Sequence, residues 1–240
     1  MSINTPFTKE NLDTYLRELG KEFRKLNGKK IPAEIILIGG AAILANYDFR
    51  EMTYDIDAII LASTAMKEAI NHVGDKLDLP NGWLNTDFKN TRSYSDKLVE
   101  VSIYYKAFSN ILTVRIVSAE YLIAMKLMSG REFKFDLSDI IGILLEHQRS
   151  NNPISREKIE NAVIKLYGSF ESVPSVSKEL LDNAFTNSNY EQVYSELRAN
   201  EKESKEALLH FEQMYPGATK SENINTILEK AKRKRDSSKK

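Results

Sequence analysis

The 240-residue sequence contains no cysteine, which excludes a disulfide framework and a thiolate zinc site. It also lacks a long hydrophobic run. The longest, Ile35–Ala45, is interrupted by two glycines and is shorter than the roughly 20 apolar residues of a membrane helix. Charged residues occur early in the chain, and no apolar segment resembles a secretory signal. These absences predict a cytoplasmic protein with no membrane partner.

The formal net charge is zero, but the charges are unevenly distributed. From Lys230 onward the chain has seven basic residues and one acid, Asp236, so the rest of the chain is acidic. Such a run is typical of a solvated, disordered end. It also fits an electrostatic contact with phosphate backbones, including those of RNA. The sequence supports both interpretations.

Hydrophobic periodicity predicts the elements of the first half of the chain. Residues 8–28 have apolar side chains at helical spacing, which predicts an amphipathic helix. The apolar runs 33–38 and 56–61 predict strands that are covered on both faces. The remaining elements expected here are a helix over 41–46, a helix from an N-cap at Ser63 to Asp78, a loop over 79–95, and a hairpin of strands 97–104 and 111–117.

After Ser118 the pattern is helical almost throughout. We therefore expect an α/β (α+β) fold with a mixed β-sheet at residues 1–150, followed by an all-helical C-terminal domain at 151–229. A basic tail at 230–240 is predicted to be disordered.

The first predicted strand ends in Gly39-Gly40, and a helix of small residues follows at once. Because glycine has no Cβ, the backbone N–H groups of such a turn can approach a phosphate closely. The helix N-terminus adds partial positive charge. Taken alone, the pair is more often an ordinary tight turn.

Asp55 and Asp57 stand on either side of Ile56, where the second predicted strand begins. The period-2 geometry of a strand directs both carboxylates to one face. Two like charges this close need a counter-charge, and Mg²⁺ prefers carboxylate oxygens together with substrate phosphates. Solvent-exposed capping is the alternative, but charge placed beside an apolar strand is costly without a reason. We interpret the pair as metal ligands.

Glu100 lies between two valines in the predicted strand 97–104. It is either on the solvent face or a third carboxylate of the metal site. In the second case, two metal ions would share it with the aspartate pair, and it would activate an incoming hydroxyl.

In combination, Gly39-Gly40, Thr53-Tyr54-Asp55-Ile56-Asp57 and the later Glu100 resemble the minimal nucleotidyltransferase pattern of the DNA polymerase beta superfamily. More narrowly, the segment 118–139 resembles the AbiEii-type branch and its relatives. The resemblance covers roughly residues 30–150. It implies a nucleotidyltransferase core in which Thr53 supports the site.

The resemblance also implies roles for residues of segment 118–139. Lys126 matches the motif lysine and is expected to reach the triphosphate, with Arg131 or Lys134 assisting. Asp136 and Asp139 match the paired acids of the next helix. At i, i+3 these acids share one helical face, and they are expected to orient Lys126 or a metal-bound water. Helix capping is their alternative role.

Two departures from the superfamily pattern stand out. The turn has Gly40 where many members carry serine, which removes one hydroxyl contact to phosphate. The third acid is Glu100, where aspartate is common.

The sequence thus predicts an Mg²⁺-dependent nucleotidyltransferase, with one or two Mg²⁺ ions, that binds a nucleoside triphosphate such as ATP. It would transfer the nucleoside monophosphate to an RNA (tRNA), protein or small-molecule acceptor and release pyrophosphate. By resemblance, the setting is a bacterial toxin–antitoxin or phage-defence system with an antitoxin partner. Two alternatives are an antibiotic-type small-molecule adenylyltransferase and a non-catalytic nucleotide-binding or partner-binding module.

Overall fold

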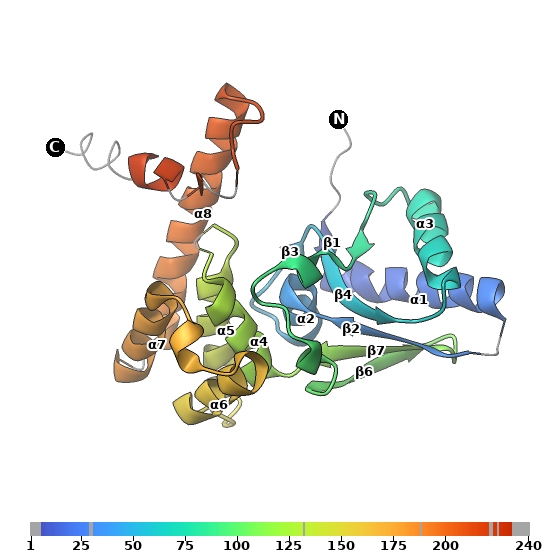
Figure 1. Ribbon diagram of the computed structural model, residues 1–240, viewed down its shortest axis with the longest axis horizontal. Coiled ribbons are helices and arrows are strands. Elements are labelled where there is room, and N and C mark those ends of the chain that lie inside the picture. The colour runs from blue at the N-terminus through green and yellow to red at the C-terminus, as the bar shows by residue number, and fades with distance from the viewer. Residues whose placement is uncertain are drawn as a thin grey trace.

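The computed structural model describes residues 6–28, 31–131, 133–187, 189–220, 223–224 and 226–231. A β-sheet with its covering helices lies beside a group of helices from the second half of the chain (Figure 1). This confirms the predicted α/β (α+β) class with a helical C-terminal part. Residues 232–240, most of the predicted basic tail, lie outside the described residues.

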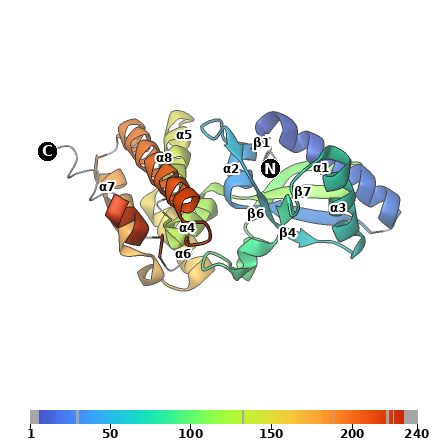
Figure 2. The ribbon, with the colours of Figure 1, turned by 90° about the horizontal axis from the view of Figure 1, so that it is seen from above.

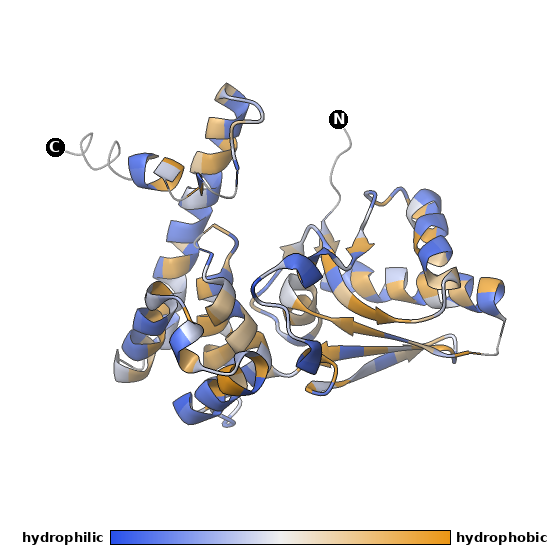
Figure 3. Cartoon of the chain, in the orientation of Figure 1, coloured by the Kyte–Doolittle hydropathy of each residue, from blue (hydrophilic) through white to orange (hydrophobic). Residues whose placement is uncertain are grey.

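Five strands form the main sheet in the spatial order β5-β4-β2-β7-β6. They are β2 (Ala33–Leu37), β4 (Ile56–Leu61), β5 (Leu84–Asn85), β6 (Ser102–Phe108) and β7 (Leu112–Val117). The central strand β2 pairs antiparallel with β4 and parallel with β7, so the sheet is mixed, as predicted. β6 and β7 form the predicted hairpin. The central strands are strongly hydrophobic (Figure 3), as expected for strands with both faces covered.

Two helices, α1 (Lys9–Asn27) and α3 (Ala65–Leu77), pack against each other over one face of the sheet (Figures 1 and 2). α1 is the amphipathic helix predicted over 8–28, and its buried side chains recur at helical spacing. α3 begins after Thr64 rather than after Ser63, so the predicted N-cap was wrong by one residue. The hydroxyl of Ser63 instead donates to Asn27 on α1, at 2.9 Å.

A second, two-stranded sheet precedes the aspartate pair. β1 (Phe7–Thr8) pairs antiparallel with β3 (Met52–Thr53), with Phe7 opposite Thr53. This pairing anchors the residues immediately before Asp55. The short helix α2 (Gly39–Asn46) follows β2 and contacts both β3 and β4.

The helical part contains α4 (Ala119–Ser129), α5 (Asp136–Arg149), α6 (Arg156–Tyr167), the 3₁₀ helix η3 (Phe170–Ser172), α7 (Ser175–Asn187) and α8 (Tyr190–Met214). α4 and α5 pack against each other, while α6 packs on α4 and α8 packs on α5. Gly130 ends α4 in the left-handed conformation that glycine adopts readily. Within the described part of the chain, no helix combines the length and the apolar character needed to cross a bilayer.

Two predicted segments differ from the structure. The predicted loop 79–95 contains the short strand β5 and the 3₁₀ helix η1 (Asp87–Asn90). The predicted strand 97–104 begins only at Ser102, because its first residues form the 3₁₀ helix η2 (Asp96–Leu98) and a turn. Leu98 and Val101 are buried there at a spacing of three, so a turn supplies apolar residues to the core that the sequence pattern assigned to a strand.

Candidate active site

A cavity of about 350 Å³ lies between the helical part and the edge of the sheet at which β2 ends and β4 begins. It is lined by segments far apart in sequence, namely the turn after β2, the β3–β4 connection, the β5–η1 segment, α4 and the turn after α4. Of the residues proposed from sequence, those that line it are Gly39, Gly40, Thr53, Asp55, Asp57, Lys126, Arg131 and Lys134.

The glycine turn directly faces the aspartate pair. Gly39 starts α2 with φ 55°, a left-handed conformation that suits glycine. A Cβ on Gly39 would lie 3.7 Å from Oδ2 of Asp57. The N–H of Ile38 donates to the carbonyl of Asp57 at 3.1 Å, which fixes the two strand ends side by side. The structure therefore brings the turn and the pair together in one wall of the cavity.

The surroundings of the aspartate pair disfavour the charged form of Asp57. Asp57 is half-buried at the start of β4, whereas Asp55 is exposed. Burial, and then the charge of Asp55, raise the pKa of Asp57 to about 6. The nearby cations Lys134 and Arg131 act in the opposite direction without cancelling this effect. Such a pair favours the binding of a cation.

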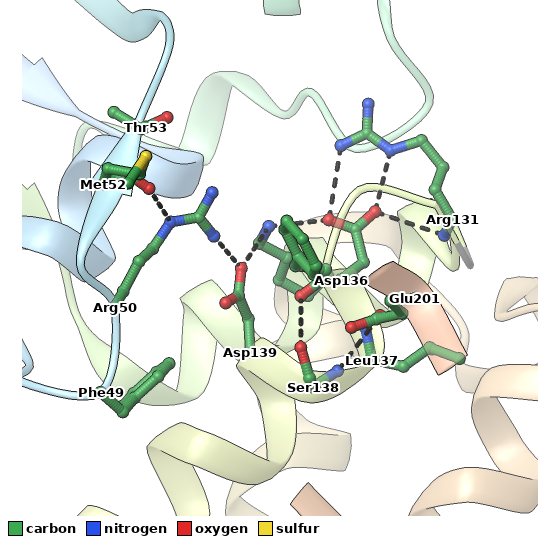
Figure 4. A network of polar contacts seen from close by, with 12 residues as sticks. Phe49, Arg50, Met52, Thr53, Arg131, Asp136, Leu137, Ser138, Asp139 and Glu201 are labelled. Atoms are coloured by element: carbon green, nitrogen blue, oxygen red, sulfur yellow. Dashed lines mark hydrogen bonds and ion pairs between the residues drawn. The ribbon is translucent and has the colours of Figure 1, made fainter. Parts of the chain in front are cut away.

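A chain of ion pairs runs along the opposite wall (Figure 4). Nζ of Lys126 lies 2.7 Å from Oδ1 of Asp136 and 3.0 Å from Oδ2 of Asp139. Nε of Arg131 lies 2.8 Å from Oδ2 of Asp136, and Arg50 pairs with Asp139. Both aspartate side chains are fully buried. The charges thus alternate along the chain, with a cation at each end.

Lys126 is held by carboxylates as well as lining the cavity. Burial opposes its charge, but Asp136 and Asp139 outweigh burial and raise the pKa of Lys126. Burial likewise opposes the charge of Asp136, and Lys126 and Arg131 outweigh it, so the pKa of Asp136 is well below its ordinary value. Asp136 and Asp139 contact Lys126, as expected if they orient it. That Lys126 reaches the triphosphate stays a prediction.

The first turn of α5 is capped by a residue of α8. Oε1 of Glu201 accepts hydrogen bonds from the N–H groups of Leu137, at 2.9 Å, and Ser138, at 3.3 Å. Glu201 is 2% exposed, and burial raises its pKa to about 7. Among the described residues, its Oε2 and Oδ1 of Asp139 are buried without a hydrogen-bond partner. Helix capping was the alternative role for Asp136 and Asp139. Glu201, and not these aspartates, accepts from the two N–H groups at the start of α5.

Glu100 does not lie where the sequence pattern placed it. It is exposed in the turn between η2 and β6, outside any strand. It is also not among the residues that line the cavity. The expectation of a strand position was wrong, because the chain enters β6 only two residues later.

The cavity contains two charged residues that the sequence analysis did not select. Asp87 begins η1, just after β5, where Asn85 pairs with Asp57, and its charge contributes to the raised pKa of Asp57. Arg50 lies before β3 and reaches across to α5. An acid in a polar loop and a basic residue before a two-residue strand carry no local pattern that distinguishes them from solvated side chains.

The acids present fit a magnesium ion that is shared with a substrate. Among the residues that the structure describes, no group of three or more His, Cys, Asp or Glu side chains is placed to hold a metal ion. Asp55 and Asp57 can offer two carboxylates, and Mg²⁺ commonly takes one or two carboxylates and completes its shell with phosphates and water. The donor set therefore fits Mg²⁺ bound together with a polyphosphate.

The glycine turn and the paired-aspartate strand, which carry the resemblance to nucleotidyltransferases, face one cavity at the edge of a mixed sheet. Comparison with family models agrees. The model described as "Nucleotidyltransferase of unknown function (DUF6036)" matches residues 14–192, and the chain belongs to this family. The description names the class and no branch within it. Searches of curated proteins and of solved structures gave no significant match.

Proposed function

We propose that this protein transfers a nucleoside monophosphate from a nucleoside triphosphate to an acceptor and releases pyrophosphate. The observation that supports this proposal is the composition of the cavity beside the aspartate pair. A glycine turn, two adjacent carboxylates and four basic side chains line it together. Enzymes of phosphoryl and nucleotidyl transfer need this combination, because their catalysis consists largely of positioning and charge neutralisation.

Asp55 and Asp57 would hold one Mg²⁺ ion, or at most two. Their fit follows from two neighbouring carboxylates that line one cavity, where burial and then the charge of Asp55 raise the pKa of Asp57. When bound, Mg²⁺ neutralises charge on the triphosphate and on the oxygens that attack and leave. Thr53 supports the pair, because its hydroxyl lies 3.3 Å from Oδ1 of Asp55.

The triphosphate would lie along the glycine turn and the basic wall. Gly39 and Gly40 are the first residues of α2, so their backbone N–H groups can donate to phosphate oxygens at the N-terminus of this helix. Arg131 and Lys134 face the same space, and their charges reach Asp57. Lys126 lines the cavity too, held between its two carboxylates, and would add positive charge to this wall.

In the transfer step, an acceptor oxygen or nitrogen attacks the α-phosphorus. The bond from that phosphorus to the bridging oxygen breaks, pyrophosphate leaves, and the acceptor gives up one proton. We propose Asp87 as the third acid of the site and the group that takes this proton, because it lines the cavity beside Asp57. Glu100 was the sequence-based choice for this role, and the experiment below compares the two acids.

The acceptor and the biological setting form the finer part of the proposal. An RNA, such as a tRNA, a protein or a small molecule can each supply the nucleophile. The resemblance of segment 118–139 to AbiEii-type proteins supports a toxin role with an antitoxin partner. In that case, expression of the chain would arrest growth, and co-expression of an adjacent antitoxin-like gene would relieve the arrest. An antibiotic-type adenylyltransferase would instead transfer nucleotide to a small molecule without RNA.

Labelled ATP, CTP, GTP and UTP, each with Mg²⁺, should be incubated with the protein and with total RNA, total protein or small-molecule acceptors. We expect label transfer and pyrophosphate release with at least one combination. Asp57→Asn should lower the rate by about a hundredfold or more, because it removes a charge that the reaction needs. Asp57→Asn that transfers nucleotide at the wild-type rate would refute the site. Binding of nucleotide without transfer to any acceptor would favour a non-catalytic module.

The same assay identifies the third acid. Asp87→Asn should lose most of the activity, and Glu100→Gln should retain it, because only Asp87 lines the cavity. The reverse outcome would restore the sequence-based choice of Glu100.

A further inference from the structure

Gly40 has no space for a side chain. A Cβ at this position would lie 2.8 Å from Oγ1 of Thr53, 2.9 Å from Nη2 of Arg50 and 3.2 Å from its Cζ. The first two distances are shorter than real Cβ contacts, so Thr53 or Arg50 would have to shift to admit a side chain here. The guanidinium of Arg50 and the hydroxyl of Thr53 therefore occupy the space that a side chain at position 40 would need. The observed position of the Arg50 guanidinium therefore requires a glycine at position 40.

Two anchors fix the orientation of Arg50. Its Nε donates to the carbonyl of Met52 at 3.2 Å, and its Nη1 pairs with Oδ2 of the buried Asp139. Among the described residues, Nη2 has no hydrogen-bond acceptor, and it points away from Asp139 toward the glycine turn (Figure 4). The side chain is 9% exposed and lines the cavity. A pre-oriented N–H donor is thus directed at the place where a phosphate would meet the turn.

Charge balance also leaves Arg50 available for a ligand. Asp139 contacts Lys126 as well as Arg50, and Asp136 contacts Lys126 as well as Arg131. Arg198 also pairs with Asp139, at 3.9 Å, so the network has four cations, namely Arg50, Lys126, Arg131 and Arg198, and two anions. Of its terminal cations, Arg50 and Arg131 line the cavity. A ligand with negative charge can bind this excess positive charge.

We propose that Arg50 binds a phosphate group of the nucleoside triphosphate through Nη2, in place of the hydroxyl that is missing at Gly40. This inference rests on the proposed function, since it concerns the same substrate. Arginine suits the position because its rigid fork can hold Asp139 with one nitrogen and a phosphate with another. Arg50 is thus a substrate-binding residue as well as a link between the sheet and α5.

Isothermal titration with Mg²⁺ and inorganic tripolyphosphate, and separately with Mg²⁺ and each of the four nucleoside triphosphates, tests this role. Loss of one charge-assisted contact in Arg50→Ala should weaken binding by about 10- to 100-fold. Arg50→Lys keeps a positive charge for Asp139 and should fold, yet it should also bind more weakly, because one ammonium cannot replace the fork. Asp139→Asn keeps the guanidinium and should lose less affinity than Arg50→Ala.

A double variant separates phosphate binding from a purely structural role. Removal of the guanidinium in Arg50→Ala opens space beside Gly40, so Gly40→Ser combined with Arg50→Ala should regain part of the lost affinity. Gly40→Ser alone should bind poorly, because its side chain would collide with Arg50. If Arg50 served only to link the sheet to α5, the double variant would not regain affinity for the triphosphate.

The outcomes distinguish the inference from the proposed function. A wild-type protein that binds neither tripolyphosphate nor any of the four nucleotides would overturn both. A wild-type protein that binds them, with Arg50→Lys and Arg50→Ala binding equally well, would overturn the role of Arg50 alone.

Discussion

Lys126 shows how one residue can link stability to the site. Its ammonium holds two fully buried carboxylates, so Lys126→Met would leave Asp136 with Arg131 alone, and Asp139 with Arg50 and the more distant Arg198. Loss of one member of a buried ion pair costs about 3–5 kcal/mol, and the remaining arginines favour the lower end. For a chain of this size we expect a fall of about 10 °C in the melting temperature, measured by circular dichroism.

Lys134 is the matched control for this prediction. It lines the same cavity but is exposed and makes no ion pair among the described residues. Lys134→Met should therefore leave the melting temperature nearly unchanged and weaken triphosphate binding. If Lys126→Met melted like the wild type and lost only binding, Lys126 would be a substrate ligand and not a structural cation.

The site residues that could be predicted from the sequence lie beside recognisable strands, whereas those that were missed depend on contacts with distant parts of the chain. Gly39, Gly40, Asp55 and Asp57 lie next to strands whose apolar character is visible locally, so their mutual position follows once β2 and β4 pair. Arg50 is held in place by Asp139, a residue 89 positions later in the chain. Such a contact depends on how the helical part docks on the sheet, and no local pattern encodes that arrangement.

At the scale of elements, the capping of α5 by Glu201 gives the fold a dependence on pH. Burial, together with the charge of Asp139, raises the pKa of Glu201 to about 7, above its ordinary value of 4.5. A group with a raised pKa in the folded state binds its proton more tightly there than in the unfolded chain. The contribution of Glu201 to stability is therefore complete below about pH 4.5 and is lost as the pH rises through about 7.

Glu201→Gln should remove this dependence, because the amide oxygen can still accept from the two backbone N–H groups of α5 and carries no charge. We expect a melting temperature near the wild-type value at pH 5 and above it at pH 8. The difference in unfolding free energy should be at most about 3 kcal/mol.

Glu201→Ala is the control for the cap itself. It loses both accepted hydrogen bonds, so it should be less stable than Glu201→Gln at every pH, by about 1 kcal/mol. Parallel pH profiles of the wild type and Glu201→Gln would show that Glu201 does not titrate in this range.

Most elements could be predicted from sequence because their burial patterns are regular. α1 shows a helical period, and β2 and β4 are continuous apolar runs. The errors fall where elements are too short to show a period, namely at β5 with two residues and η2 with three. Their conformation is determined by the strands and core beside them and not by their own composition.

At the scale of the whole molecule, the cavity depends on contacts between the sheet and the helical part. α4 and α5 lie within the predicted 1–150 domain, yet their packing partners include α6 and α8, which lie beyond it. The hydroxyl of Tyr194, on α8, donates to the carbonyl of Phe49 at 3.2 Å, beside Arg50. The cavity wall therefore contains residues whose positions depend on helices after residue 150.

These contacts predict the behaviour of a fragment that ends at residue 150. Without α6–α8, the first turn of α5 loses its cap, and apolar faces of α4 and α5 become exposed to water. We expect fragment 1–150 to melt without a cooperative transition and to bind a hydrophobic dye. A control fragment, 1–220, keeps α8 whole and should melt cooperatively.

If fragment 1–150 also melted cooperatively, residue 150 would be a true domain boundary, and the helical part would be an addition to a self-sufficient core. The contacts of α8 with α5 and with Phe49 instead place the helices among the parts that build the cavity, so we expect nucleotide binding to be lost with them.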